Sequence, residues 1–265
     1  MLKLGWLSTG RGEGSRGFLN LVQGEIESGA LDARIEFVFS NREQGESEGS
    51  DLFFKLVKGY GIPLVTLSSH RYRTEHGGGP MYKYREPFHD EVINLISKFR
   101  PDIYVLAGYM LITSAKMCLL YPMINLHPAL PGGPIGTWQQ VIWQLIENNA
   151  TTSGIMFHLV TEVLDGGPVL TYCNFPINGA AFQPLWEDLK GQTIEELKSQ
   201  GEDQPLFKEI RREGAFREGP LLLATLRALI SKTINVSGSK VLNSSGVPMD
   251  GECMNEQIKQ MLSTE

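Results

Sequence analysis

Apolar residues follow two alternating spacings along the first half of the chain. Short runs rich in apolar residues, typical of buried strands, cover residues 2–8, 34–39, 63–67 and 103–107. Between them, residues 18–28, 51–60 and 86–99 carry apolar positions every three or four residues, which predicts helices. Regular alternation of strand and helix implies parallel strands joined by crossover helices. The pattern therefore predicts an α/β protein with an open, mostly parallel, twisted sheet and helices on both faces.

The second half continues this pattern without a linker. A helix is expected over 137–148, strands over 153–160 and 169–173, and an amphipathic helix over 218–231. The polar, glycine-rich residues 68–84 predict a mobile surface loop, and residues 178–205 a surface insertion. The tail predicts a small hairpin and a short helix. We therefore expect one domain over 1–235, with the insertion at 178–205, and a C-terminal extension over 236–265.

Charge and cysteine usage narrow the class of protein. The 24 basic and 30 acidic residues give a net charge of −6, which argues against a general nucleic-acid binder and still allows a local basic pocket. The three cysteines are scattered and none forms a CxxC pair, which is atypical of disulfide frameworks and zinc sites. We expect a protein of the reducing cytoplasm that acts on small molecules, as a monomer or homodimer.

The sequence shows no signal for secretion, for a membrane span or for metal binding. The N-terminus runs directly into a glycine-rich loop and lacks the apolar core of a signal peptide, and no segment approaches the length of a membrane span. The five histidines have no metal-ligand spacing, so no metal site is expected. Three of them stand in or beside polar segments and are expected to be solvated: His70, His76 and His89.

The loop between the first strand and the first helix carries candidate chemistry. Residues 10–17 contain four glycines, and glycine-lined amides at the start of a helix make an anion site. The pattern is not the dinucleotide fingerprint, because its third glycine is missing and Ser40-Asn41 stands where an acidic residue would be. A plain tight turn is the simpler interpretation. Ser15, Arg11 and Arg16 in the same loop favour phosphate binding.

Two further polar motifs interrupt the apolar pattern. Asn125 and His127 stand two residues apart before Pro128, and side chains at that spacing point to the same side of an extended segment. Asp165 precedes two glycines and a proline, which allows a sharp bend with the carboxylate pointing into a cleft. Each motif by itself is more often an ordinary loop or turn. Their combination indicates a site.

Asn, His and Asp in this order, downstream of residues 105–110, resemble the folate-dependent formyltransferase family. The resemblance runs from about Leu4 to Leu229. The matching segments are Gly14-Ser15, Val38-Phe39-Ser40-Asn41, Gly61-Ile62-Pro63, Leu106-Ala107-Gly108-Tyr109-Met110, Asn125-Leu126-His127-Pro128, Gly136, His158-Leu159-Val160-Thr161 and Asp165-Gly166-Gly167-Pro168. The resemblance implies a formyltransferase, Rossmann-like fold, which agrees with the sheet predicted from the pattern.

The family moves a formyl group from N10 of 10-formyltetrahydrofolate to a primary amine. The resemblance is nearest to the branch that formylates glycinamide ribonucleotide in purine biosynthesis. It implies that Asn125 stabilises the charged oxygen of the tetrahedral intermediate, that His127 polarises this oxygen or moves the amine proton, and that Asp165 orients the imidazole or a water. Formyl-folate is then a co-substrate, and no metal takes part.

The resemblance also implies the binding residues. The folate is expected at Met110, Leu111 and Ile112 on one side and at His158, Val160 and Thr161 on the other, with Arg85 at its carboxylate tail. The substrate phosphate is expected at Gly14, Ser15 and Arg16, and the rest of the acceptor at Glu218.

Three positions depart from the family pattern, and two of them concern the acceptor. Trp138 stands where members commonly have a histidine, residues 130–134 differ from the usual loop, and Gly219 follows Glu218 where a histidine is expected. Formyl transfer to an amino sugar nucleotide, or hydrolysis of formyl-folate, is thus an alternative. The Gly-Ser loop favours glycinamide ribonucleotide over the sugar acceptors. A nucleotide-binding module without catalysis is a third alternative, in which the Asn, His and Asp are dispensable.

Overall fold

The computed structural model describes residues 1–263, and its contacts divide the chain into two compact units. The first unit comprises Met1–Asn125, Leu159–Gly167 and Arg227–Pro248. The second comprises Leu126–His158, Pro168–Leu226 and the C-terminal segment from Met249. Each unit is assembled from separate stretches of the chain. The boundary proposed between residues 235 and 236 therefore stays a prediction.

The main sheet of the first unit consists of five parallel strands. Their order in space is β5 (Met123–His127), β4 (Ile103–Leu106), β1 (Leu2–Leu7), β2 (Ala33–Ser40) and β3 (Leu64–Thr66). The chain moves outward from β1 to β3 and then returns to β4 on the other side of β1. This reversal makes a switch point at the carboxyl ends of β1 and β4, where open α/β sheets bind ligands. The predicted parallel sheet is confirmed.

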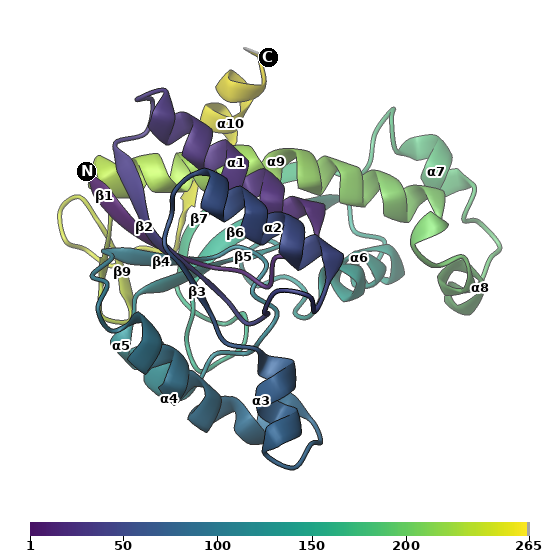
Figure 1. Cartoon of the computed structure of the whole chain (residues 1–265). Helices are drawn as coiled ribbons and strands as arrows, with labels where there is room; N and C mark the ends of the chain where they lie inside the picture. The colour runs from purple at the N-terminus through teal and green to yellow at the C-terminus, as the bar shows by residue number, and fades with distance from the viewer. Residues whose placement is uncertain (264–265) are drawn as a thin grey trace. The chain divides into compact units, whose positions relative to one another are not determined.

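Helices cover both faces of this sheet. In Figure 1, α1 (Glu13–Glu27) and α2 (Glu48–Gly59) lie on one side of the strands, and α4 (Arg85–Ile96) and α5 (Ala115–Leu120) lie on the other. Alternate residues of β2, Phe37 and Phe39, point toward the α4 side, where they pack with Phe88 and Val92. All four side chains are fully buried. The hairpin predicted for the tail is present in this unit as β8 (Ile234–Ser237) and β9 (Lys240–Asn243).

The second unit is built on three strands and the long helix α9 (Pro205–Ile230). Strand β7 (Val169–Pro176) pairs antiparallel with β6 (Thr152–Leu159) and parallel with β10 (Glu252–Cys253). The remaining elements are α6 (Trp138–Glu147), α7 (Gln183–Glu187), α8 (Ile194–Ser199), the 3-10 turn η2 (Gly201–Asp203) and α10 (Asn255–Leu262). The core packs α6 and α9 against residues from the predicted insertion, among them Phe182 and Leu197.

Three segments differ from the sequence-based expectation. Residues 68–84 contain α3 (Ser69–Glu75) and the 3-10 turn η1 (Met81–Tyr84), so the prediction of a mobile loop is wrong. Tyr72 is 6% exposed and packs edge-on against Phe88 at 5.3 Å, which stabilises α3 in spite of the surrounding glycines. Helix α9 starts at Pro205 rather than at Glu218, and Pro220 lies inside it. The predicted surface insertion contains two short helices, and Leu197 of α8 and Phe182, just before α7, are buried.

Candidate functional site

The loops that follow β1 and β4 meet at the switch point. The amide of Thr9 donates to the Gly108 carbonyl (3.0 Å), and the amide of Met110 donates to the Thr9 hydroxyl (2.9 Å). Gly108 has a φ of +73°, and a Cβ there would come within 2.6 Å of the Ser15 Oγ. Only glycine satisfies both conditions without strain. The structure thus brings Ser15 of the predicted phosphate loop close to the segment predicted for folate.

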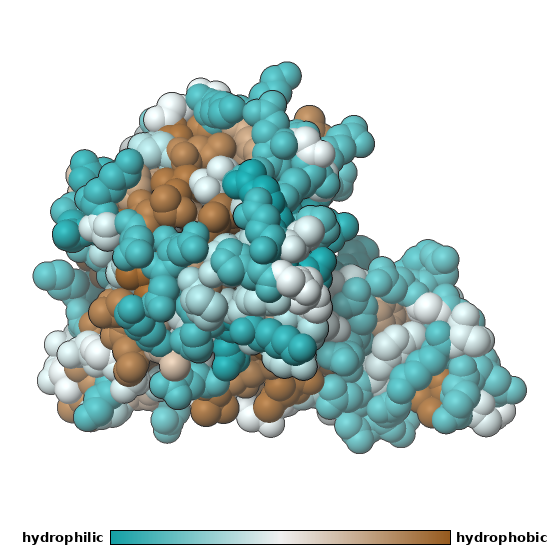
Figure 2. Space-filling model, turned by 60° about the horizontal axis from the view of Figure 1, so that its bottom comes forward, coloured by the Kyte–Doolittle hydropathy of each residue, from teal (hydrophilic) through white to brown (hydrophobic). Residues whose placement is uncertain are grey.

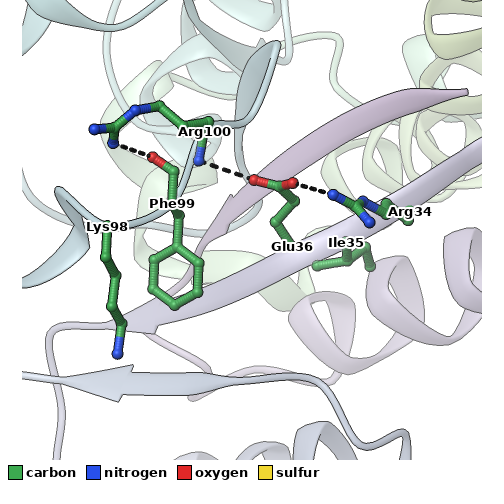
Figure 3. A pocket seen from close by; sticks show the side chains of 6 residues that line it. All are labelled: Arg34, Ile35, Glu36, Lys98, Phe99 and Arg100. Carbon is green, nitrogen blue, oxygen red and sulfur yellow. Dashed lines mark hydrogen bonds and ion pairs between the residues drawn. The ribbon is translucent and has the colours of Figure 1, made fainter.

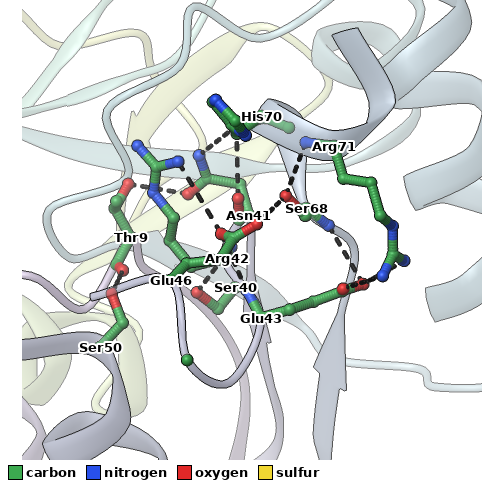
Figure 4. A network of polar contacts seen from close by, with 12 residues as sticks. Thr9, Ser40, Asn41, Arg42, Glu43, Glu46, Ser50, Ser68, His70 and Arg71 are labelled. Carbon is green, nitrogen blue, oxygen red and sulfur yellow. Dashed lines mark hydrogen bonds and ion pairs between the residues drawn. The ribbon is translucent and has the colours of Figure 1, made fainter. Parts of the chain in front are cut away.

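A buried polar network holds these loops in place (Figure 4). The Thr9 hydroxyl donates to Oδ1 of Asn41 (2.8 Å), and Nδ2 of Asn41 donates to the Ser69 hydroxyl (3.1 Å). The Ser50 hydroxyl donates to the Thr9 carbonyl (3.0 Å). All four side chains are buried, where satisfied polar networks rigidify a fold and unsatisfied ones are costly. The loops after β1, β2 and β3 therefore form one rigid support.

The predicted phosphate loop lies in the first turn of α1. The helix starts at Glu13 rather than at Phe18, so Gly14, Ser15 and Arg16 are helical, and its N-cap residue makes no side-chain hydrogen bond. First-turn amides carry the positive end of the helix dipole, which favours an anion, although the Glu13 carboxylate in the same turn opposes one. Nη1 of Arg16 donates to the carbonyl of Gly49 (3.3 Å), which holds its charge against α2. The phosphate role stays a prediction.

Two apolar side chains of the predicted folate segment are exposed. Met110 is 73% exposed and Ile112 52%, whereas Leu111 packs against the core. Large apolar residues at least half exposed also include Leu119, Leu120, Val163 and Leu164. Figure 2 shows apolar patches among polar residues on one face of the surface. Such exposure favours a binding surface for a flat, partly apolar ligand, which fits the predicted folate.

A cavity of about 250 Å³ adjoins the segment that carries Asp165. Two residues predicted to bind folate, Val160 and Thr161, line it. Sequence analysis missed the lining residues that come from α5 and the turn after it, from the start of β5 and from the tip of the hairpin; they include Cys118, Tyr121 and Met123. No motif marks these residues, because only the packing of α5 brings them to the cavity.

Arg85 is the first residue of α4, and a buried histidine ties it to the folate segment. His89 donates from Nδ1 to the Arg85 carbonyl (2.8 Å), and its Nε2 accepts from the Tyr109 hydroxyl (3.1 Å). His89 is fully buried, so the prediction that it is solvated is wrong, and burial lowers its pKa. The neutral ring thus links α4 to the residue before Met110. Arg85 lies 3.6 Å from the Glu86 carboxylate, and its buried Nε makes no hydrogen bond.

Strand β5 carries the Asn-His motif. Asn125 pairs with Leu106 of β4, and His127 is the last residue of the strand and 2% exposed. Nε2 of His127 lies 2.8 Å from the Pro134 carbonyl. A carbonyl only accepts, so Nε2 carries a proton. The ring also packs edge-on against buried His158, with centroids 6.3 Å apart.

Asp165 lies on a sharply bent loop of the first unit. Its φ is +51°, a left-handed conformation that Asp and Asn adopt more readily than other non-glycine residues. The amide of Gly166 donates to the Val163 carbonyl (3.2 Å), which closes the turn. A Cβ on Gly167 would overlap the carbonyl oxygen of Leu159. The backbone therefore requires glycine at position 167 and favours Asp, Asn or Gly at position 165.

The close approach at Gly167 predicts a stability effect. Gly167→Ala should lower the free energy of unfolding by about 1–3 kcal/mol, because the backbone must shift away from Leu159. Gly24→Ala is the matched control, since a Cβ there meets open space inside α1. The control should raise stability by about 0.5–1 kcal/mol. Urea denaturation of both variants measures the difference, and effects of equal sign and size would contradict it.

Glu218, predicted for the acceptor, is buried on α9. Its residue exposure is 9%, and Nη1 of Arg211 on the same helix donates to its Oε1. The guanidinium of Arg211 stacks on the ring of Trp138, with the central carbon 5.0 Å from the centroid. The structure thus joins Trp138 and Glu218, two positions that sequence analysis treated separately, through an arginine that it did not single out.

A larger cavity lies at the amino ends of the first unit's strands, away from the switch point at their carboxyl ends (Figure 3). Its volume is about 440 Å³, and residues 34–36 at the start of β2 and 98–100 before β4 line it. None of the predicted site residues does. Within residues 1–263, no cluster of three or more histidine, cysteine or acidic side chains could hold a metal. No helix in this range has the length and apolar character needed to cross a membrane.

Two curated proteins that are similar to this chain carry the same name. A phosphoribosylglycinamide formyltransferase of Escherichia coli is 36% identical over 99 residues, which cover 35% of this chain and 44% of the relative. The chain thus spans less than half of that relative's length. The protein of the same name from Dictyostelium discoideum is 30% identical over 169 residues, 60% of this chain and 78% of the relative.

A solved structure extends the likeness at the level of the fold. The glycinamide ribonucleotide transformylase 1 of Symbiobacterium toebii superposes with a TM-score of 0.63 at 20% identity, over 91% of this chain and 93% of the other. The model of the formyl transferase family matches residues 12–181, which include the Asn125, His127 and Asp165 positions. The chain belongs to the formyl transferase family.

Proposed function

We propose that this protein transfers the formyl group of 10-formyltetrahydrofolate to the primary amine of glycinamide ribonucleotide. The observation that carries the proposal is β5, which ends in Asn125 and a buried His127 whose Nε2 is held by the Pro134 carbonyl. The relatives named for this reaction support the choice of substrates. The enzyme would work in the cytoplasm, without a metal, as a monomer or homodimer.

Asn125 is proposed to stabilise developing charge. When the amine attacks the formyl carbon, the carbonyl oxygen becomes negative, and a fixed amide donor stabilises it more in the transition state than in the ground state. Asn125 is only partly buried, and its backbone is fixed by pairing of β5 with β4. An amide side chain suits this role because it donates without losing a proton.

His127 is proposed to move the proton. The amine must lose a proton as the new C–N bond forms, and N10 of the folate must gain one as its bond to the formyl carbon breaks. Nδ1 of His127 accepts the first proton and returns it to N10, while Nε2–H stays on the Pro134 carbonyl. Asp165 favours the charged imidazole formed between these two steps.

The binding residues complete the proposal. Met110, Ile112, Val160 and Thr161 present apolar surface or cavity lining for the folate ring. Leu111 supports that surface from a partly buried position, and the buried His158 is proposed as a further folate contact. The first turn of α1, with Gly14, Ser15 and Arg16, binds the acceptor phosphate. Glu218 contacts the remainder of the acceptor.

The test is a transfer assay on the purified full chain. With 10-formyltetrahydrofolate and glycinamide ribonucleotide, the expected result is the formylated ribonucleotide, identified by its mass, together with tetrahydrofolate. Parallel reactions contain an amino sugar nucleotide or no amine. Tetrahydrofolate release that needs no amine would identify a hydrolase instead. Product formed only from the amino sugar nucleotide would contradict the proposed acceptor.

Arg85 gives a prediction that separates the two substrates. Arg85→Ala should raise the KM for formyl-folate about tenfold, a loss of about 1.4 kcal/mol, because the guanidinium no longer pairs with the folate carboxylate. The KM for the acceptor should stay within twofold. Arg71→Ala, which removes an exposed arginine paired with Glu43 and Glu75, is the control. A larger effect on the acceptor would assign Arg85 to the phosphate side.

A further inference from the structure

Arg211 compensates the charge of Glu218 within α9. The two residues are seven positions apart, which places them on one face of the helix, and Nη1 of Arg211 donates to Oε1 of Glu218. The Glu218 side chain is 11% exposed and the Arg211 side chain 35%. Removing one partner of a buried ion pair leaves an uncompensated charge. Among residues 1–263, Arg211 has no other hydrogen-bonded side-chain partner.

The indole of Trp138 fixes the plane of this guanidinium from a second helix. The central carbon of Arg211 lies 5.0 Å from the Trp138 ring centroid, and that ring packs on Phe207 at 5.7 Å. The ring quadrupole attracts a cation that lies over an aromatic face, and a stacked guanidinium keeps a defined orientation.

The start of α6 connects this group to His127. The loop of residues 130–136 runs from β5 to α6, and its Pro134 carbonyl binds His127. Nε2 of Gln144 in α6 donates to the carbonyl of Ile135 (3.2 Å), and Thr137 caps the helix through a reciprocal bond with Gln140. The same helix end thus supports the catalytic imidazole and the Trp138 ring.

We propose that Arg211, held by Trp138, is a positioning residue that sets the acceptor specificity of the enzyme through Glu218. Arg211 binds Oε1 of Glu218, so that Oε2 is presented in a fixed direction to accept hydrogen bonds from the sugar hydroxyls of the acceptor. Charge-assisted hydrogen bonds of this kind are strong and directional. Arg211 itself does not touch the substrate. The inference rests on the proposed function, because that function assigns Glu218 to the acceptor.

The test compares Michaelis constants for the two substrates. Arg211→Met should raise the KM for glycinamide ribonucleotide at least 30-fold and leave the KM for formyl-folate within twofold. Arg211→Lys should recover part of the loss, since it keeps the charge without the planar fork. Trp138→Leu should raise the acceptor KM only two- to fivefold, because it removes the stacking of the guanidinium on the indole and leaves the ion pair. Arg212→Met is the matched control on the same helix, since Arg212 is 69% exposed and pairs with Glu209 and Glu213.

A double variant keeps the test valid if Arg211→Met unfolds. Glu218→Gln with Arg211→Met removes both charges, so no buried charge is left unpaired, and its acceptor KM should equal that of Glu218→Gln alone. A further increase would overturn the inference, as would equal changes in both Michaelis constants of Arg211→Met.

Calorimetry of glycinamide ribonucleotide binding, without folate, distinguishes a failure of the Arg211 inference from a failure of the proposed function. Equal affinity of wild type and Arg211→Lys would overturn the role of Arg211 and leave the proposed function intact. If the wild type neither binds nor formylates this ribonucleotide, the proposed function fails, and the role of Arg211 fails with it. Weaker binding by Arg211→Lys, with normal formyl-folate binding, is the expected result.

Discussion

Replacing His127 is expected to lower kcat for formyl transfer by about 10²–10⁴-fold, the usual contribution of a positioned acid–base group. Such a variant lacks the imidazole that we propose takes the amine proton. His127→Ala also leaves the Pro134 carbonyl without its donor and opens a cavity at a side chain that is 2% exposed. These losses destabilise the fold by about 1–3 kcal/mol.

His127→Gln separates catalysis from stability. The glutamine amide can donate to the Pro134 carbonyl and fills most of the space of the ring, but it does not titrate. We expect thermal denaturation near that of the wild type together with the full loss of turnover. His70→Ala, which removes an exposed histidine, is the control and should leave both unchanged. Normal turnover of His127→Gln would refute the proton-transfer role.

Asp165→Asn is expected to lower kcat by about 10²–10³-fold, the range found when one electrostatic stabiliser of a transition state is removed. The substitution removes the negative charge that we propose favours the imidazolium. It keeps the shape of the side chain, and asparagine tolerates the φ of +51° at this position. The Michaelis constants should change less than kcat, because the charge acts mainly in the transition state.

Two further variants separate charge from backbone strain at this position. Asp165→Ala would add the cost of a left-handed alanine, which Asn149→Ala measures at an exposed position with a φ of +49°. Asp165→Gly removes the charge and the strain together, so its stability should equal or exceed that of the wild type. If Asp165→Gly retained turnover, the carboxylate would have no part in the reaction.

Local patterns predicted the elements that are long and strongly periodic. The strands at residues 2–8 and 103–107 and the helix after Thr137 lie within one or two residues of their predicted limits. Thr137 gives a capping box with Gln140, a signal that depends only on neighbours in the sequence. The parallel order of the strands followed from their alternation with helices.

Elements that depend on distant contacts were missed or displaced. Helix α3 has seven residues, too few to be stable alone, and forms because Tyr72 packs against Phe88 of another helix. Pro220 hid the continuity of α9, because a proline inside a helix removes a hydrogen bond and usually marks an end. The burial of Leu206 and Leu221 on either side of it maintains the helix.

The sequence by itself determined the α/β class, the family and the identities of the candidate Asn, His and Asp, since these are local motifs in a fixed order. The tertiary structure decided three properties of the site. It fixed the proton of His127 on the nitrogen facing Pro134, buried His89 as a link between α4 and Tyr109, and joined Trp138 to Glu218 through Arg211. Each is a hydrogen bond or contact whose partner is set by packing, and one sequence carries no local signal of such partners.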